Sequence, residues 1–171
     1  MEAIVAVYAD WGIGAAGTQQ IVIPEDRKRF RELTEGATIV VGRKTLEDFP
    51  GGKPLPNRRN VVLSSQKDLV VEGADVVHSV EELLETVKDD PRVFVVGGAS
   101  VYNQLLPYCD RIYITRIYET PKSDAFFRNL DEDFNWTCEE FGDAKFHEGI
   151  KYRFSQYDLY DLQKIINKGK K

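Results

Sequence analysis

Short runs rich in β-branched residues alternate with helix-like segments along most of this chain, and this alternation constrains the fold more than any other feature. Strand patterns cover residues 3–8, 38–41, 60–63, 93–96 and 111–117. Helical patterns cover residues 24–34, which begin with Pro24; 79–88, where Ser79 and Glu82 have capping-box spacing; and 100–106, which precede Pro107. Strands that alternate with helices predict an α/β fold with a mostly parallel central sheet flanked by helices.

The last third of the chain has a different pattern. Residues 153–160 alternate between polar and apolar side chains, and no helical segment precedes them. This arrangement is typical of an antiparallel edge hairpin, formed with residues 111–117 or with a neighbouring strand. The sheet is therefore expected to be mixed, mostly parallel, with an antiparallel C-terminal edge hairpin.

The 171 residues of the chain suit a single domain. We expect that domain to span residues 1–163. Residues 164–171 contain four lysines, and we expect them to form a basic C-terminal tail.

Composition argues against several classes of function. No apolar run approaches the roughly 20 residues of a membrane span, and the N-terminus lacks the basic stretch of a signal peptide. The net charge of -5 argues against a general nucleic-acid surface. Cys109 and Cys138 belong to no metal or disulfide pattern, and neither His78 nor His147 lies in a catalytic pattern. We therefore expect a cytoplasmic protein that binds no metal, membrane or nucleic acid.

Asp26 is the most informative single residue. In a helix that begins near Pro24, it shares one stripe with Phe30 and Leu33, at spacings of four and seven residues. A carboxylate at the start of an inward apolar face, next to a phenyl ring, suits a pocket for a flat heterocycle. Alternatively Asp26, like Glu25, is a first-turn acid that stabilises the helix dipole. The residues alone leave both interpretations open.

Glycines, cations and hydroxyl groups follow three of the expected strands. Gly42-Arg43-Lys44-Thr45 follows the strand at 38–41, Ser64-Ser65 follows Leu63, and Gly97-Gly98 follows the strand at 93–96. Such strand ends suit phosphate binding, because glycine lets the backbone approach a pyrophosphate and cations balance its charge. Tight turns and close packing are the alternative explanation for each of them.

Arg58 and Arg59 follow Pro56-Asn57 in a loop. A pair of arginines in a loop can bind a substrate carboxylate in bidentate fashion, although such pairs are more often solvated.

Taken in order, the motifs of this chain resemble dihydrofolate reductase. They are Ile4-Val5-Ala6-Val7 followed by Trp11-Gly12-Ile13-Gly14, Ile23-Pro24-Glu25-Asp26 with Phe30, Val41-Gly42-Arg43-Lys44-Thr45, Pro54-Leu55-Pro56-Asn57-Arg58, and Val96-Gly97-Gly98-Ala99-Ser100-Val101-Tyr102. The resemblance covers nearly the whole chain. It implies reduction of 7,8-dihydrofolate to 5,6,7,8-tetrahydrofolate with NADPH, by hydride transfer to C6 and protonation of N5, with water rather than Asp26 as the immediate proton donor.

The resemblance also implies a role for each matching residue. Asp26, supported by Thr115, would bind the 2-amino group and ring nitrogen of the pterin, and Tyr102 would lie close to the hydride path. The substrate would contact Ile4, Ala6, Asp26, Phe30, Phe49, Leu55, Arg58, Val96 and Thr115. Arg58 would bind the glutamate α-carboxylate. Asp26 is expected to be the only charge in the pterin site.

The cofactor half follows in the same way. Arg43, Lys44, Ser64 and Ser65 resemble contacts of the ribose 2'-phosphate, and the Gly97-Gly98 peptide bond is cis in this family. The whole cofactor set would be Ala6, Ile13, Gly14, Gly42, Arg43, Lys44, Thr45, Leu63, Ser64, Ser65, Val96, Gly97, Gly98, Ala99, Ser100, Val101 and Tyr102.

Four departures from the family pattern affect these expectations. Two extra residues around Pro50-Gly51-Gly52 affect the loop on the substrate side. Gln19-Gln20-Ile21 stands where many members have Leu-Pro-Trp, so the loop from Gly14 to Val22 is expected to close differently. Ser100 replaces a basic residue that often assists the cofactor phosphate, and Arg27 replaces an apolar residue beside the substrate.

Two other functions remain as alternatives. One is the pyrimidine reductase of riboflavin synthesis, which has the same fold but would not need Asp26, Phe30 and Arg58 together. The other is a noncatalytic nucleotide-binding module, which would not need an inward acid. On the main interpretation the protein is a monomer, and its partners are dihydrofolate and antifolate inhibitors.

Overall fold

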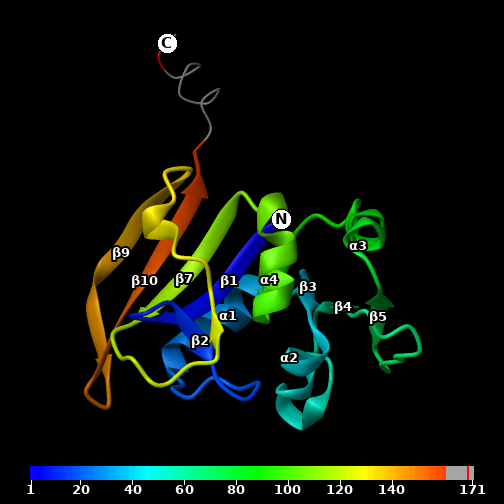
Figure 1. The fold of residues 1–171 in the computed structure, drawn as a ribbon, viewed down its shortest axis with the longest axis horizontal. Helices are drawn as coiled ribbons and strands as arrows, with labels where there is room; N and C mark the ends of the chain where they lie inside the picture. Colours follow the sequence, from blue (N-terminus) through cyan, green and yellow to red (C-terminus); the bar gives the residue numbers. More distant parts are fainter. Residues whose placement is uncertain (161–168, 170–171) are drawn as a thin grey trace.

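An eight-stranded sheet forms the centre of the computed structural model, which describes residues 1–160 and 169 (Figure 1). Its strand order is β5-β4-β3-β6-β1-β7-β10-β9. The strands are β1 (Glu2–Tyr8), β3 (Thr38–Val41), β4 (Arg59–Leu63), β5 (Ala74–Val77), β6 (Val93–Gly97), β7 (Arg111–Ile117), β9 (Trp136–His147) and β10 (Ile150–Leu159). A second, two-stranded sheet pairs β2 (Gly12–Gly14) with β8 (Ala125–Phe126).

The predicted mixed sheet is confirmed. Every pairing from β5 through to β7 is parallel, whereas β10 pairs antiparallel with both β7 and β9. The antiparallel hairpin lies at one edge of the sheet, where Figure 1 shows β9 as the outermost strand.

The helices are α1 (Pro24–Thr34), α2 (Arg43–Glu47), α3 (Val80–Val87) and α4 (Ala99–Leu105). Short 3-10 helices occupy Pro50–Gly52, Leu106–Tyr108 and Leu130–Glu132. The predicted boundaries of α3 include its cap, since Ser79 lies outside the helix and its side chain accepts a hydrogen bond from the backbone N–H of Glu82.

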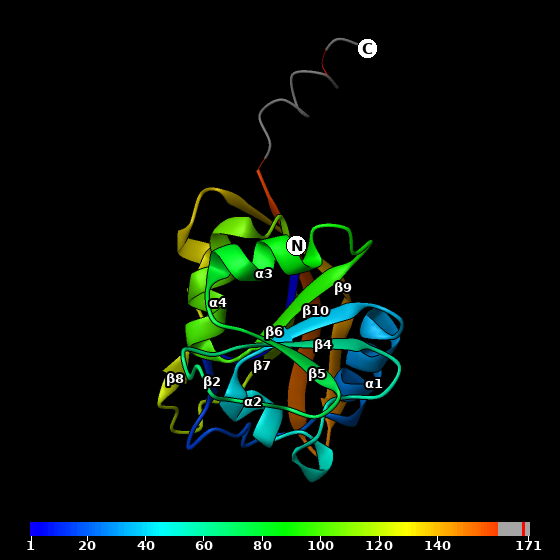
Figure 2. The same ribbon diagram turned by 90° about the vertical axis from the view of Figure 1, so that its right-hand side faces the viewer.

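Helices α3 and α4 cover one face of the sheet, and α1 and α2 cover the other (Figure 2). Along β1, Ala3, Val5 and Val7 pack in the core cluster that also holds the buried residues of α3 and α4. Ile4 points to the opposite face, where it packs in a cluster with Phe30 of α1. This alternation places α1 and its acidic first turn on the face of β1 that carries Ile4 and Ala6.

Two neighbouring parallel strands, β3 and β6, end at the same edge of the sheet. There the backbone N–H of Gly42 donates a hydrogen bond to the carbonyl of Gly97, at 2.8 Å. The glycines that follow β3 and end β6, which the sequence analysis identified separately, are therefore in direct contact, as expected for adjacent parallel strands.

No helix among residues 1–160 is long and apolar enough to span a membrane. Within the same residues, no group of three or more His, Cys, Asp or Glu side chains is arranged to hold a metal ion. The expected basic tail, residues 164–171, lies outside the described residues apart from residue 169.

Candidate active site

The Asp26 carboxylate lies against the central sheet. It belongs to the first turn of α1, which starts at Pro24, and it accepts a hydrogen bond of 2.5 Å from the hydroxyl of Thr115 on β7. Removal from water raises the pKa of Asp26, while the hydrogen bond from Thr115 and the charges of Arg29 and Arg27 act in the opposite direction. Asp26 is thus in the first turn of the helix, as the alternative interpretation also requires, but its carboxylate points inward to a buried strand.

An apolar wall extends from this acid along α1. Of the residues assigned to the substrate, the structure places five in one cluster around Ile39, Phe94 and Tyr113: Ile4, Phe30, Phe49, Leu55 and Val96. Ala6 belongs to a different cluster, but in the sheet it is paired in register with Thr115. The predicted substrate residues are therefore neighbours in the fold, although they come from six separate segments of the chain.

Arg58 lies at the far end of the same wall. Its Nε donates to the hydroxyl of Thr34, the last residue of α1, at 2.8 Å, and one terminal nitrogen donates to the carbonyl of Pro56 at 2.6 Å. The guanidinium carbon is 5.9 Å from the centre of the Phe30 ring. Partial burial lowers the pKa of Arg58 from its usual value, but the group remains cationic at any physiological pH.

Arg59 has a different role. It forms ion pairs with Asp75 at 3.1 Å and with Asp90 at 2.8 Å. The two loop arginines therefore diverge, and only Arg58 faces the apolar wall.

Asn60, which sequence reasoning missed, holds the loop that carries Leu55 and Arg58. Its buried side chain accepts from the backbone N–H of Leu55 at 3.0 Å and donates to the carbonyls of Leu55 and Arg58. An asparagine at the start of an otherwise apolar strand is the signal that could have identified it, since a buried amide needs such partners.

The glycine pair at the end of β6 is tightly packed. The peptide bond between Gly97 and Gly98 is cis, as the resemblance implies. A Cβ atom on either glycine would lie 3.3 Å from the hydroxyl oxygen of Thr45 in α2. Any side chain there would crowd Thr45, so the backbone forms the surface at this point.

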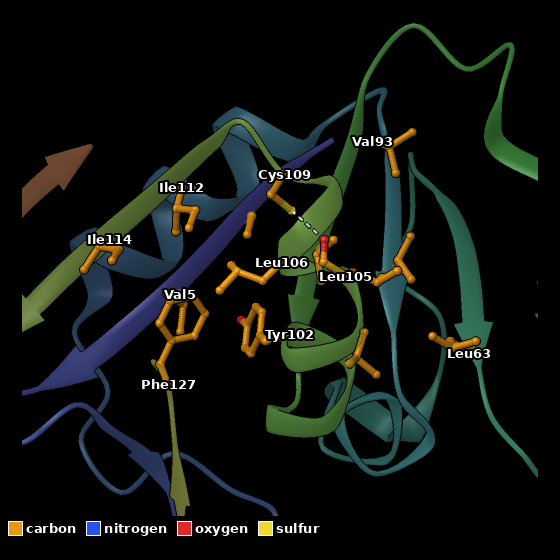
Figure 3. Packing of buried hydrophobic residues seen from close by; sticks show 14 of the residues in the cluster. Val5, Leu63, Val93, Tyr102, Leu105, Leu106, Cys109, Ile112, Ile114 and Phe127 are labelled. Atoms are coloured by element: carbon orange, nitrogen blue, oxygen red, sulfur yellow. Dashed lines mark hydrogen bonds between the residues drawn. The ribbon is translucent and has the colours of Figure 1, made fainter. Parts of the chain in front are cut away.

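Tyr102 lies between α4 and β1, with Phe127 beside it (Figure 3). Its hydroxyl donates to the carbonyl of Ile4 at 2.7 Å, and its ring meets Phe127 edge to face with 5.0 Å between centroids. Burial raises the pKa of Tyr102 well above its usual value. Tyr102 is therefore a neutral side chain that connects α4, which carries expected cofactor residues, to β1, which carries expected substrate residues.

The cationic and hydroxyl residues of the expected phosphate site occupy two adjacent strand ends. Arg43 and Lys44 begin α2 directly after β3, and Ser64 and Ser65 follow β4, which pairs with β3. Lys44 and Ser65 are exposed, whereas Arg43 forms an ion pair of 2.6 Å with Glu47. Arg43 thus already has a carboxylate partner within its own helix.

The residues present fit NADPH. Cations and hydroxyl groups gather where a 2'-phosphate would need them, and the glycine surface beside Thr45 lies one strand away, where a pyrophosphate would approach. Of the other predicted cofactor residues, Ala99, Ser100 and Val101 form the first turn of α4, Ile13 lies in β2, and Leu63 is the buried last residue of β4.

The loop from Gly14 to Val22 is held by contacts that the sequence did not predict. Gly14 pairs with Ala125 of β8, and the backbone N–H of Ala16 donates to Asp124 at 2.9 Å. The side chain of Gln20 donates to the carbonyl of Lys122 at 2.6 Å. Gln20, one of the residues that depart from the family pattern, thus connects this loop to the segment before β8.

A second charged residue lies on the inner side of α1. The guanidinium of Arg29 is 4.5 Å from the ring centre of Phe154 and 5.6 Å from that of Tyr113. The spacing of three residues from Asp26 could have identified it, since residues three apart on a helix are neighbours. That Asp26 is the only charge in the pterin site stays a prediction.

Comparison with known proteins agrees with this geometry. A family model described as "Dihydrofolate reductase" matches residues 1–159. The dihydrofolate reductase of Bacillus subtilis (strain 168) is 37% identical over 144 residues, which cover 83% of this chain and 84% of that protein. The one from Mycobacterium tuberculosis (strain ATCC 25618 / H37Rv) is 41% identical over 150 residues, covering 85% and 89%.

A solved structure has the same fold. Dihydrofolate reductase from Enterococcus faecalis, complexed with NADP(H) and RAB-propyl, superposes with a TM-score of 0.82 at 36% identity, covering 94% of this chain and 96% of that chain. The family model and these similarities extend over nearly all of the described structure. The chain belongs to the dihydrofolate reductase family.

Proposed function

We propose that this chain reduces 7,8-dihydrofolate to 5,6,7,8-tetrahydrofolate with NADPH. One observation carries the proposal: an inward carboxylate, Asp26, and a cation, Arg58, lie at opposite ends of a single apolar wall. This order of acid, apolar surface and cation matches the order of pterin, benzoyl group and glutamate in the substrate.

Asp26 binds the 2-amino group and adjacent ring nitrogen of the pterin, and Thr115 fixes the orientation of the carboxylate. Phe30 packs on the pterin and benzoyl rings, Ile4 and Ala6 line the pterin side, and Phe49 and Leu55 hold the benzoyl group. Arg58 binds the glutamate α-carboxylate: Thr34 holds its Nε and the carbonyl of Pro56 holds one terminal nitrogen, and these two contacts fix the cation beside the Phe30 ring.

The cofactor residues lie at the ends of β3, β4 and β6 and in α2 and α4. Arg43, Lys44, Ser64 and Ser65 bind the 2'-phosphate, Thr45 and residues 97–101 bind the pyrophosphate, and Ala6, Ile13, Gly14 and Tyr102 surround the nicotinamide. When bound, NADPH supplies the hydride that is added to C6 of the substrate.

The protein's contribution is alignment and electrostatics. The apolar wall excludes water from the rings, and Asp26 favours the protonated form of the bound pterin. Water delivers the proton to N5, since the Asp26 carboxylate is committed to the opposite edge of the ring.

Membership of the dihydrofolate reductase family favours this function over a pyrimidine reductase or a nucleotide-binding module. The test is the loss of NADPH absorbance on adding dihydrofolate, compared with the substrate of the pyrimidine reductase. We expect turnover with dihydrofolate and none with the substrate of the pyrimidine reductase. Turnover only with the pyrimidine, or none with either, would overturn the proposal.

Three further properties belong to this proposal. The protein acts as a monomer, because the exposed edge strand β9 carries Glu139, Glu140 and Asp143, and such charges hinder edge-to-edge pairing. It works in the cytoplasm, where the free thiols of Cys109 and Cys138 stay reduced. Antifolate inhibitors bind the same site, and residues 1–163 form one domain followed by a basic tail.

A further inference from the structure

Arg29 is an unusual residue for the inner side of a helix that covers a sheet. It is partly buried, and its guanidinium lies over the ring of Phe154 from β10 and beside the ring of Tyr113 from β7. Within residues 1–160, it has neither an ion pair nor a hydrogen bond with another side chain. The two aromatic rings therefore stabilise its positive charge, and a nearby carboxylate would stabilise it further.

The neighbouring charges show which carboxylate that is. Glu25 is bound on one side by Lys145 from β9 and on the other by the hydroxyl of Tyr152 from β10. Lys145 also lies over the Phe154 ring, at 5.3 Å. Glu25 and Lys145 therefore balance each other. Arg29 is linked to Asp26 instead: Phe154, the ring under its guanidinium, is paired in register with Thr115, whose hydroxyl is bound to Asp26.

We propose that Arg29 is a positioning residue for Asp26: its guanidinium, held over Phe154 one helical turn beyond the acid, keeps the Asp26 carboxyl group ionised so that it can bind the pterin. The consequence for turnover rests on the proposed reductase function. The electrostatic step itself does not.

The groups that face Asp26 support this assignment. Thr115 from β7 gives one hydrogen bond, while the hydroxyls of Tyr102 from α4 and Tyr152 from β10 are neutral at physiological pH because their pKa values are raised. The charge of Arg29 lowers the pKa of Asp26, and the exposed Arg27 adds a smaller effect in the same direction. Arg29 thus works against the burial that would otherwise protonate Asp26.

The stacking on Phe154 explains why the arginine stays in place. A guanidinium is weakly hydrated and planar, so it can lie on an aromatic face and keep its charge at every pH at which Asp26 titrates. A lysine in the same position would keep the charge but would lose the planar contact.

The test compares Arg29→Met with Arg29→Lys and with Lys28→Met. Lys28 is on the outer side of the same helix, where it pairs with Glu32, so its removal changes the net charge equally without touching the inner face. The titration of the Asp26 carboxyl carbon is followed by NMR in the ligand-free enzyme, with Asp26→Asn to assign the signal. Arg29→Met should move the titration to higher pH, and Arg29→Lys and Lys28→Met should leave it close to that of the wild type.

The same variants give a functional readout. On the acid limb of the pH profile, kcat/KM for dihydrofolate should be about threefold lower in Arg29→Met, with little change at high pH and none in the affinity for NADPH. A purely structural role of Arg29 would lower kcat/KM equally at every pH. If Arg29→Met does not fold, Arg29→Gln serves as the second uncharged variant.

An unmoved Asp26 titration in a folded, uncharged variant would overturn the proposal, as would an equal shift in Lys28→Met. Because that titration needs neither substrate nor cofactor, such a result would refute the role of Arg29 and leave the reductase function standing. If instead the titration moves but no variant reduces dihydrofolate, the reductase function fails and the electrostatic step holds.

Discussion

Asp26 is held between burial, which favours its protonated form, and a hydrogen bond and nearby cations, which favour its ionised form. Burial is the stronger influence, so the pKa of Asp26 lies above that of a solvated aspartate. In the folded protein, the stability contributed by this group is fully present at acid pH, and it is lost as the pH rises through the raised pKa. Asp26 therefore lowers the stability of the folded protein at neutral pH.

Asp26→Asn keeps the shape of the side chain and removes the charge. We expect hydride transfer near neutral pH to fall about a hundredfold or more, with little change in NADPH affinity, because the variant cannot favour the protonated pterin. Activity at lower pH should be the least affected. Stopped-flow measurement of hydride transfer across the pH range checks this, and unchanged turnover near neutral pH would remove Asp26 from the mechanism.

The same substitution has a predicted effect on stability. Thermal melts at neutral pH should show Asp26→Asn to be as stable as the wild type or more so, since an ionised buried carboxylate is costly. At acid pH, where the wild-type group is protonated, the two proteins should converge. The prediction would be contradicted if Asp26→Asn melted below the wild type at neutral pH but not at acid pH.

Arg58→Ala tests the other end of the wall. Dihydrofolate should bind at least tenfold more weakly, because a partly desolvated guanidinium–carboxylate hydrogen bond contributes about 1.5–3 kcal/mol. NADPH affinity should barely change. A substrate analogue that lacks the glutamate is the matched control, and it should bind both proteins equally; loss of NADPH binding instead would show that the two half-sites are wrongly assigned.

At the scale of secondary structure, the proposed cofactor residues come from adjacent strand ends rather than from one contiguous motif. β4, β3 and β6 lie side by side, and each ends in glycine, serine or a cation at one edge of the sheet. The Arg43–Glu47 ion pair adds a constraint here, since a 2'-phosphate has to compete with Glu47 for the guanidinium.

Together, Arg43, Lys44, Ser64 and Ser65 should select NADPH over NADH. The wild type should have a clearly higher kcat/KM with NADPH, and replacing Lys44 by alanine should reduce that ratio, because a phosphate contact from a cation is lost. Steady-state kinetics with both cofactors measure it. Equal specificity constants in the wild type would count against the assignment, with Ser100 as the explanation.

Gly97→Ala should destabilise the protein by about 1–3 kcal/mol, because Gly97 has a φ of 132° and an added Cβ would crowd Thr45. Gly36→Ala is the matched control: its φ of 76° is also positive, but no atom lies within 4 Å of the added Cβ. Urea unfolding should show the larger loss for Gly97→Ala. Equal losses would mean that crowding at Thr45 has no effect.

Across the whole molecule, the strands marked by runs of β-branched residues were predictable from the sequence. Helix α1 was predictable too, because Pro24 and Gly36 mark its limits. β9 was not, since nearly all its side chains are exposed and nothing imposes alternation on them. Asp26 could be recognised from its position on an apolar stripe. Arg29 and Asn60 each left a signal in the sequence, but their partners Phe154 and Leu55 are known only from the fold. The contact between Gln20 and Lys122 could not be recognised, because it joins segments that only the fold brings together.

Both ends of the proposed ligand site are held by α1, so the length of this helix determines the length of ligand that can reach both ends. Asp26 is in its first turn, and Thr34, which holds Arg58, is its last residue. Eight residues at 1.5 Å each separate them by roughly 12 Å along the axis. Because a helix cannot stretch, this reach is fixed, and a compound whose spacer is too short or too long should keep one of the two polar contacts and lose the other.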